Sequence, residues 1–342
     1  MNLLKPLLTA ALLLTLAACG DSSTNAPTSG PSVKPGEKVK IGFIVKLPND
    51  PWFQNEWKFA RQAAAADNFE LKEIGLTDGS STLAAIDSLA AQGVQGFIVC
   101  SPEPKIGQAI LDRAARSGMK VMSVDDRLES ADGKPLESVP HMGITARDIG
   151  KKVGETLLAE YKKRNWPQPD TAACILTHDS AGPTQSDRTN GEADALTAGG
   201  FDPARIYKIA QKDDPTLATG RDAMNALVAQ HPEIKNWLIA GVNDGSVVGA
   251  VRATEALTIP ADRVAAVGIG VDSSLTDLSQ PKMTGFIATV LISPRRHGYD
   301  TADLMYHWIK DGTEPPKTTW TQGVLIDRAN YQQVMKEQGL AQ

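Results

Sequence analysis

From residue 39 onward, the chain alternates between two hydrophobic patterns. Short apolar runs are typical of strands buried on both faces, and the segments between them carry apolar residues at helical spacing. Strands are predicted over residues 40–46, 69–75, 96–100, 120–125 and 142–145, and helices over 55–66, 81–92, 106–117 and 147–163. Alternating strands and helices predict a parallel sheet covered by helices on both faces.

A second series of similar length follows the first. Strands are predicted over 172–177, 205–210, 237–241 and 264–270, and helices over 184–198, 216–230 and 246–255. The tail adds a strand over 285–291, a helix over 294–310, a strand over 323–326 and a last helix. Two such series predict an α/β protein of two doubly wound, Rossmann-like parallel-sheet lobes.

The N-terminus has a different pattern. Lys5 precedes a short apolar stretch, LLTAALLL at residues 7–14, which is too short for a membrane span. Residues 1–18 are therefore interpreted as a signal peptide, with a short buried helix as the alternative. Residues 19–38 are rich in Ser, Thr, Pro and Gly, and such a segment cannot bury enough apolar surface to fold, so a flexible tether is predicted.

Charge and composition argue against several classes of function. The net charge of −5 gives no electrostatic reason to expect a nucleic-acid partner. The five histidines show no metal-ligand spacing and there is no CxxC motif, so neither a metal nor a cofactor is predicted. Cys100 and Cys174 lie in separate apolar runs and are interpreted as reduced thiols, although a disulfide outside the cytoplasm stays open.

Ligands of doubly wound sheets bind beyond the carboxyl ends of the strands, so the residues after each predicted strand are the candidates. They are Lys46, Asp50, Trp52, Phe53, Cys100, Asp125, Asp126, residues 178–188, Asn243, Asp244 and Asp272. This set has carboxylates, amides and one Arg but no nucleophile paired with a base, so we expect binding without catalysis.

The chemistry of this set suits a sugar. Carboxylates accept hydrogen bonds from hydroxyl groups, an Asn side chain both donates and accepts, and an aromatic ring covers the C–H face of a sugar. Trp52 and Phe53 follow a Pro-Asn-Asp-Pro turn and fit the aromatic role. The alternatives are core packing for Phe53, an N-cap for Asn243 or Asp272, and a cap or solvated loop for the adjacent Asp125 and Asp126.

Several stretches resemble the bacterial periplasmic sugar-binding proteins, and within them the L-arabinose-binding branch. They are VKLPNDPWFQNEWKFA (45–60), AIDSLAA (85–91), GFIVC (96–100), VDD (124–126), HPEIKNWLI (231–239), ND (243–244), GAVRATE (249–255) and HGY (297–299). The resemblance runs from about residue 39 to the C-terminus. LAAC at 16–19 also resembles a lipobox, which implies that Cys19 carries a lipid.

The resemblance implies a type I periplasmic binding protein, a monomer with two lobes joined by three crossing segments. The lobes would comprise residues 39–145 plus 292–322 and residues 146–291 plus 323–342. The lobes close on a monosaccharide, and the closed form docks on an ABC permease and ATPase complex. On this resemblance the chain is a membrane-anchored periplasmic lipoprotein that binds L-arabinose, with D-galactose and D-fucose as further candidates.

The family's sugar contacts would fall on Lys46, Asp50, Trp52, Phe53, Cys100, Asp125, Asp126, Thr184, Arg188 and Asn243. Three positions depart from the arabinose branch: Asp50 replaces Glu, Ile144 replaces Met near the sugar, and Asp272 replaces Asn. The alternatives are therefore a different monosaccharide, a sugar-sensing partner of a membrane receptor or histidine kinase, and a secreted sugar-modifying enzyme.

Overall fold

The computed structural model describes residues 36–211, 214–271 and 273–340. The predicted signal peptide, the lipobox with Cys19, most of the predicted tether, and Asp272 lie outside the described residues. No helix within the described part of the chain is long and apolar enough to cross a membrane.

The first lobe is built on a six-stranded sheet with the order β11-β5-β4-β3-β1-β2, and every strand pair in it is parallel. Its strands are β1 (Lys40–Lys46), β2 (Glu70–Leu76), β3 (Gly96–Val99), β4 (Lys120–Val124), β5 (His141–Ile144) and β11 (Thr318–Thr321). Edge strand β11 is not predicted from the sequence. Its four residues TTWT carry no apolar run, and only its pairing with β5 identifies it as a strand.

The second lobe repeats the architecture with the order β12-β10-β9-β8-β6-β7. Its strands are β6 (Thr171–Thr177), β7 (Ile206–Ala210), β8 (Asn236–Gly241), β9 (Val264–Ile269), β10 (Phe286–Leu291) and β12 (Val324–Asp327). All neighbours are parallel except β12, which pairs antiparallel with β10. The predicted fold class, two doubly wound α/β lobes, is confirmed.

Helices cover both faces of each sheet, and alternate strand residues feed the two faces. In the first lobe, α1 (Pro51–Asp67) and α9 (Thr301–Lys310) cover one face, and α2 (Gly79–Ala91) and α3 (Gly107–Arg116) cover the other. In the second, α4 (Ala146–Lys163) and α5 (Pro183–Ala198) lie opposite α6 (Leu217–Gln230) and α7 (Asp244–Ala256). Shorter helices are α8 (Leu275–Ser279), α10 (Tyr331–Glu337) and the 3-10 turns Pro104–Ile106, Gln168–Asp170, Asp179–Ala181, Pro203–Arg205 and Ala261–Arg263.

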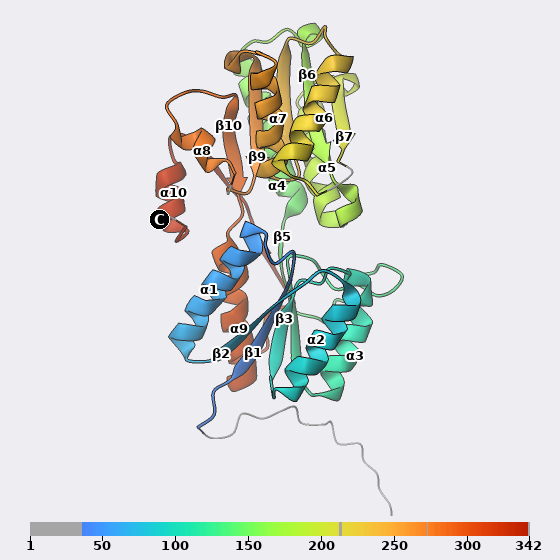
Figure 1. Cartoon of the computed structure of the whole chain (residues 1–342), viewed down its shortest axis with the longest axis vertical. Coiled ribbons are helices and arrows are strands. Elements are labelled where there is room, and N and C mark those ends of the chain that lie inside the picture. Colours follow the sequence, from blue (N-terminus) through green and yellow to red (C-terminus); the bar gives the residue numbers. More distant parts are fainter. Residues whose placement is uncertain (1–35, 212–213, 272, 341–342) are drawn as a thin grey trace, which may run out of the picture.

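The chain passes between the lobes three times, and Figure 1 shows the two lobes stacked end to end. The first crossing is Thr145, between β5 and α4. The second covers residues 292–295, between β10 and the π-helical turn η6 (Arg296–Asp300). The third covers residues 322–323, between β11 and β12. The ends of both sheets therefore meet where the crossings lie.

Two helical segments differ from the prediction by more than a small shift of their first residue. Helix α1 begins at Pro51, four residues before the predicted start, because Asp50 Oδ1 accepts a hydrogen bond from Trp52 N at 2.8 Å and proline suits a first helical position. The predicted helix over 294–310 is divided into the π turn η6 and α9. Trp52 and Phe53 therefore stand on the first turn of a helix and not in a loop.

Candidate functional site

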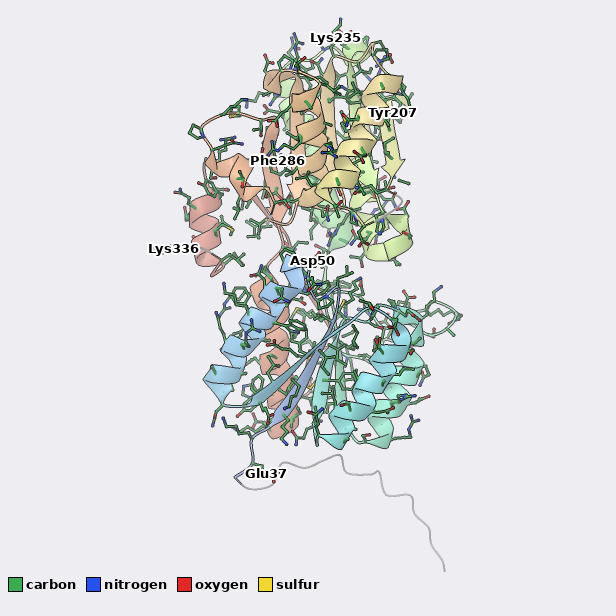
Figure 2. The ribbon with its side chains drawn as sticks, in the orientation of Figure 1. Glu37, Asp50, Tyr207, Lys235, Phe286 and Lys336 are labelled. Carbon is green, nitrogen blue, oxygen red and sulfur yellow. The ribbon has the colours of Figure 1, made fainter. Side chains whose placement is uncertain are left out.

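The candidate residues gather where the carboxyl ends of the two sheets face each other. Lys46 ends β1, Asp125 and Asp126 follow β4, and Asp50 precedes α1. Figure 2 shows Asp50 at the end of the first lobe that faces the second lobe. Thr184 and Arg188 come from the first two turns of α5 in the second lobe. Parallel strands place these residues at one edge, as predicted from their positions after the strands.

Asp126 is the polar centre of this arrangement. One of its carboxylate oxygens pairs with Lys46 Nζ, and Cys100 Sγ lies 3.7 Å from the same oxygen. Its other oxygen accepts a hydrogen bond of 3.1 Å from Thr184 Oγ1, which belongs to the second lobe. Burial disfavours the Lys46 charge, but the neighbouring Cys100 and Asp126 outweigh it, so the pKa of Lys46 lies above its usual value.

Asp125 and Asp126 serve different neighbours although they are adjacent in sequence. Asp125 has a φ of 60°, which ends the strand and turns the chain. Asp125 Oδ2 accepts a hydrogen bond of 3.3 Å from Trp52 Nε1. The Asp125 and Asp126 side chains are only 14% and 15% exposed, and both carboxylates bond to other side chains. The alternative of a helix cap or a solvated loop is therefore wrong for this pair.

Trp52 is half-buried and packs against hydrophobic clusters of both lobes. Ile144, the last residue before the first crossing, is also buried in the cluster of the second lobe. Phe53 is only 5% exposed and lies in the core of the first lobe with Trp57, the alternative that sequence analysis left open for Phe53. An aromatic side chain at the junction of the lobes is therefore supplied by Trp52.

Arg188 is anchored on one side only. Its Nη1 donates to the Val242 carbonyl at 2.7 Å, while its buried Nε has no hydrogen-bond partner among the described residues. On the same helix, the buried Oε1 of Gln185 also lacks a partner within the described part of the chain. Buried polar atoms are normally satisfied, so each of these atoms is available to a polar ligand or to water.

Asn243 is the N-cap of α7. Its Oδ1 accepts from Ser246 N at 3.0 Å and from Ser246 Oγ at 2.8 Å, and its Nδ2 donates to the Pro215 carbonyl at 2.8 Å. The capping alternative is therefore correct. A sugar that bonds to Asn243 would have to share a side-chain amide that already caps the start of α7.

Three buried residues of this group were not identified from the sequence: Glu56 and His297, which lie beside Asp125, and Thr321, which lies beside His297. His297 Nδ1 lies 2.7 Å from Asp125 Oδ1, and its Nε2 lies 2.7 Å from Thr321 Oγ1. One signal was available for Glu56, because it shares the apolar face of α1 with Phe53, Trp57 and Ala60. His297 and Thr321 join the group only through contacts between distant parts of the chain.

The Glu56 carboxyl group is fully buried, and neither of its oxygens receives a hydrogen bond from the described residues. Burial, and then the neighbouring Asp125, raise the pKa of Glu56 well above its usual range. Burial would also raise the pKa of Asp125, but His297 and the hydrogen bonds to Asp125 lower it. The pair thus separates into a neutral Glu56, able to donate, and an ionised Asp125 that accepts.

Among the described residues, two groups of side chains have a spacing that a metal ion could use. Ligand atoms of Glu56, Asp125 and His297 lie within 4.8 Å of one another, as do those of the more exposed Asp67, Asp303 and His307. In the first group, Asp125 and Thr321 already engage both ring nitrogens of His297, which leaves neither nitrogen for a metal. The buried group therefore fits a hydrogen-bond network better than a metal site.

Two cavities lie away from these residues. One of about 590 Å³ is lined by Arg164, Trp166 and Met283 in the second lobe. Another of about 330 Å³ lies beside the crossing segments, with Trp320 and Gln322 in its wall. Neither contains the convergent carboxylates and donors found around Asp126. Cys100 and Cys174 are both free and buried, which confirms the predicted thiols.

Comparison with known proteins adds a family to this geometry. Residues 38–334 match the family described as periplasmic binding proteins and sugar binding domain of LacI family. The chain belongs to this family. It is 42% identical over 305 residues to the L-arabinose-binding periplasmic protein of Escherichia coli (strain K12), a match that covers 89% of this chain and 92% of that protein.

A second relative of this periplasmic binding protein is similar over nearly its whole length. The ABC transporter L-arabinose-binding periplasmic protein of Azospirillum brasilense is 40% identical over 338 residues, which cover 98% of this chain and 97% of the relative. Among solved structures, the periplasmic component of the arabinose ABC transporter from Shewanella sp. ANA-3 superimposes with a TM-score of 0.73. At 17% identity, over 88% of this chain and 95% of that one, this likeness supports the fold alone.

Proposed function

We propose that this periplasmic binding protein captures L-arabinose between its lobes and delivers it to an ABC-type sugar importer. The observation that carries the proposal is Asp126, which is held by Lys46 of the first lobe and by Thr184 of the second. The identity of 42% and 40% to two L-arabinose-binding proteins supports the choice of sugar. No step of this function makes or breaks a covalent bond, so the proposed role is not that of an enzyme.

The proposed mechanism is hinge closure. A ligand that contacts both lobes binds the closed arrangement better than the open one and shifts the population toward it. Sugar hydroxyls would form hydrogen bonds with Lys46, Asp126 and Arg188. The buried Nε of Arg188 is available for such a bond. Trp52, which packs on both lobes, would cover the C–H face of the ring.

Further residues at the junction of the lobes are proposed as sugar contacts. Asp50, Cys100, Asp125, Ile144 and Thr184 surround the same junction. Phe53 would act from the core beneath Trp52, and Asn243 would share its amide between the sugar and the helix cap. Asp272 is proposed from the sequence only.

Location and assembly are also proposals. The named periplasmic relatives support export to the periplasm. The signal peptide over residues 1–18, the lipid on Cys19 and the tether over residues 19–38 would hold the protein near a membrane. We propose a monomer whose lobes comprise residues 39–145 plus 292–322 and residues 146–291 plus 323–342.

The test is calorimetric titration of the purified protein with L-arabinose, D-galactose, D-xylose, D-ribose and D-glucose. Saturable binding of L-arabinose with a Kd near or below 1 µM, about 8 kcal/mol of binding free energy, is the expected result. Tight binding of another of these sugars would keep the binding site and overturn the choice of ligand. No binding of any of the five would overturn the proposal.

A further inference from the structure

His297 stands where two of the crossing segments leave the first lobe. It belongs to η6, which directly follows the second crossing, and Thr321 is the last residue before the third crossing. His297 Nε2 lies 2.7 Å from Thr321 Oγ1, and His297 is fully buried. One side chain therefore connects the first-lobe ends of two crossing segments.

The other ring nitrogen of His297, Nδ1, faces the proposed sugar site. A carboxylate only accepts hydrogen bonds, so His297 Nδ1 donates to Asp125 Oδ1 across the 2.7 Å between them. The second oxygen of Asp125 accepts from Trp52 Nε1 at 3.3 Å. The rings of Trp52 and His297 also meet edge to face, with centroids 5.2 Å apart. His297 thus fixes Trp52 in two ways, directly and through Asp125.

The imidazole has little freedom to turn away. A Cβ atom on Gly298 would lie 2.1 Å from the Glu56 carbonyl oxygen, so η6 and α1 are in backbone contact at this point. The Glu56 side chain closes the group from the side of α1 and is itself fully buried. Close packing and hydrogen bonds together hold the imidazole between Asp125 and Thr321.

We infer that His297 is a positioning residue for ligand binding, which couples the crossing segments at Thr321 to the orientation of Asp125 and Trp52. The inference rests on the proposed sugar-binding function. When the lobes rotate, the crossing segments move, and the hydrogen bond between Thr321 and His297 passes that movement to the site. Without this link, the orientations of Asp125 and Trp52 are less well fixed. The free-energy preference of the liganded protein for the closed form over the open form is then smaller.

The first test uses a matched pair of variants at Thr321, in the full chain, with L-arabinose as the probe. Thr321→Val keeps the shape and removes the hydroxyl, and we expect a Kd about tenfold higher, mainly through faster dissociation. Thr321→Ser keeps the hydroxyl and should bind within about twofold of the wild type. Thermal unfolding is measured on both, because a merely structural role would change the unfolding midpoint and leave the Kd of the folded protein unchanged.

The second test breaks the same link from the other side. In His297→Asn the side-chain amide can still donate toward Asp125 but is too short to reach Thr321. Because His297→Asn also removes the ring contact with Trp52, it should bind at least as weakly as Thr321→Val. One shared link predicts that Thr321→Val adds almost no further loss when it is combined with His297→Asn, and not another tenfold.

Failure of the positioning role and failure of the proposed sugar-binding function would give different results. If the wild type binds L-arabinose and both single variants bind it within twofold, the inference is overturned and the proposed function stands. Additive losses in the double variant would also overturn the coupling. If the wild type fails to bind, the proposed function falls, and the inference falls with it. Should Thr321→Val fail to fold, His297→Asn alone decides.

Discussion

At the scale of single residues, the polar contact between the lobes is made by a carboxylate with partners on both sides. Asp126 is held by Lys46 from its own lobe and by Thr184 from the other. A carboxylate whose orientation is fixed by one strong partner is a good acceptor for a hydroxyl group. The contact from Thr184 then depends on how far the lobes are closed.

The contribution of that contact can be measured with variants of one side chain. Thr184→Val removes the donor to Asp126 and keeps the shape. A hydrogen bond to a charged group is worth about 1.5 kcal/mol or more, so we expect L-arabinose to bind about tenfold more weakly. Thr184→Ser is the matched control and should bind within about twofold. Equal affinities of the two variants would show that the hydroxyl does not contribute.

His141 gives a prediction on pH dependence. It is buried, and its Nδ1 lies 3.0 Å from Ser123 Oγ. Burial, and then the charge of Arg127, lower the pKa of His141 from 6.5 to about 3. Between pH 6.5 and about pH 3, His141 is protonated in the unfolded chain but neutral in the folded protein. The resulting stability is complete above about pH 6.5 and is lost as the pH falls toward about 3.

The measurement is urea unfolding of the wild type and of His141→Gln between about pH 7 and pH 4. The free energy of unfolding of the wild type should fall more steeply, by up to about 1.4 kcal/mol for each pH unit. The glutamine variant keeps a polar partner for Ser123 and cannot titrate, so the carboxylates common to both proteins cancel in the comparison. Parallel curves would contradict this origin of the pH dependence.

At the scale of elements, the position of α5 depends on small residues between helices. A Cβ atom on Gly150 of α4 would lie 1.8 Å from the Arg188 carbonyl oxygen, and one on Gly191 of α5 would lie 2.2 Å from the Arg147 carbonyl oxygen. Backbone meets backbone at these points, so neither contact can be relieved by a change of rotamer. The close approach of α4 and α5 thereby fixes the residues that α5 presents to the junction of the lobes.

Gly150→Ala should therefore act on binding as well as on stability. The added methyl group pushes α5 away from α4 and moves Arg188, so we expect a loss of about 1–3 kcal/mol in unfolding free energy and weaker binding of L-arabinose. Gly199→Ala is the control, because its Cβ would meet the flexible Leu158 side chain at the far end of α5. Urea unfolding and calorimetric titration of both variants check this. Unchanged binding by Gly150→Ala would show that α5 tolerates the shift.

Most elements were predictable because their hydrophobic period is local. Strand β6, seven buried residues in a row, is recognisable from its sequence alone. The start of α1 was missed because Pro51 was read as part of a turn, although it is also a good first residue for a helix capped by Asp50. The link from Asp125 to His297 joins residues 172 positions apart, and no local pattern predicts such a contact.

At the scale of the whole molecule, the two lobes have separate hydrophobic cores. Two hydrophobic clusters cover the faces of each sheet, and Ile144 of the first lobe is packed in a cluster of the second. Within the described residues, the chain crosses between the lobes at three places. Trp52, Ile144 and Thr184 are among the side chains that join the two lobes. Cooperative unfolding requires the parts to share a core, so the unliganded lobes should unfold as two units.

Differential scanning calorimetry tests this, with two overlapping transitions expected for the unliganded protein. L-arabinose in hundredfold excess over its Kd should add about 2.7 kcal/mol to the stability of the closed form. Because the proposed ligand contacts both lobes, this energy is lost when either lobe unfolds, and the two transitions should merge into one at higher temperature. In Asp126→Asn, at the same sugar concentration, the transitions should stay separate, since the shared acceptor has lost its charge. A single transition without sugar would instead show that contacts between the lobes already couple their unfolding. Less binding free energy from the ligand would then be needed to populate the closed form.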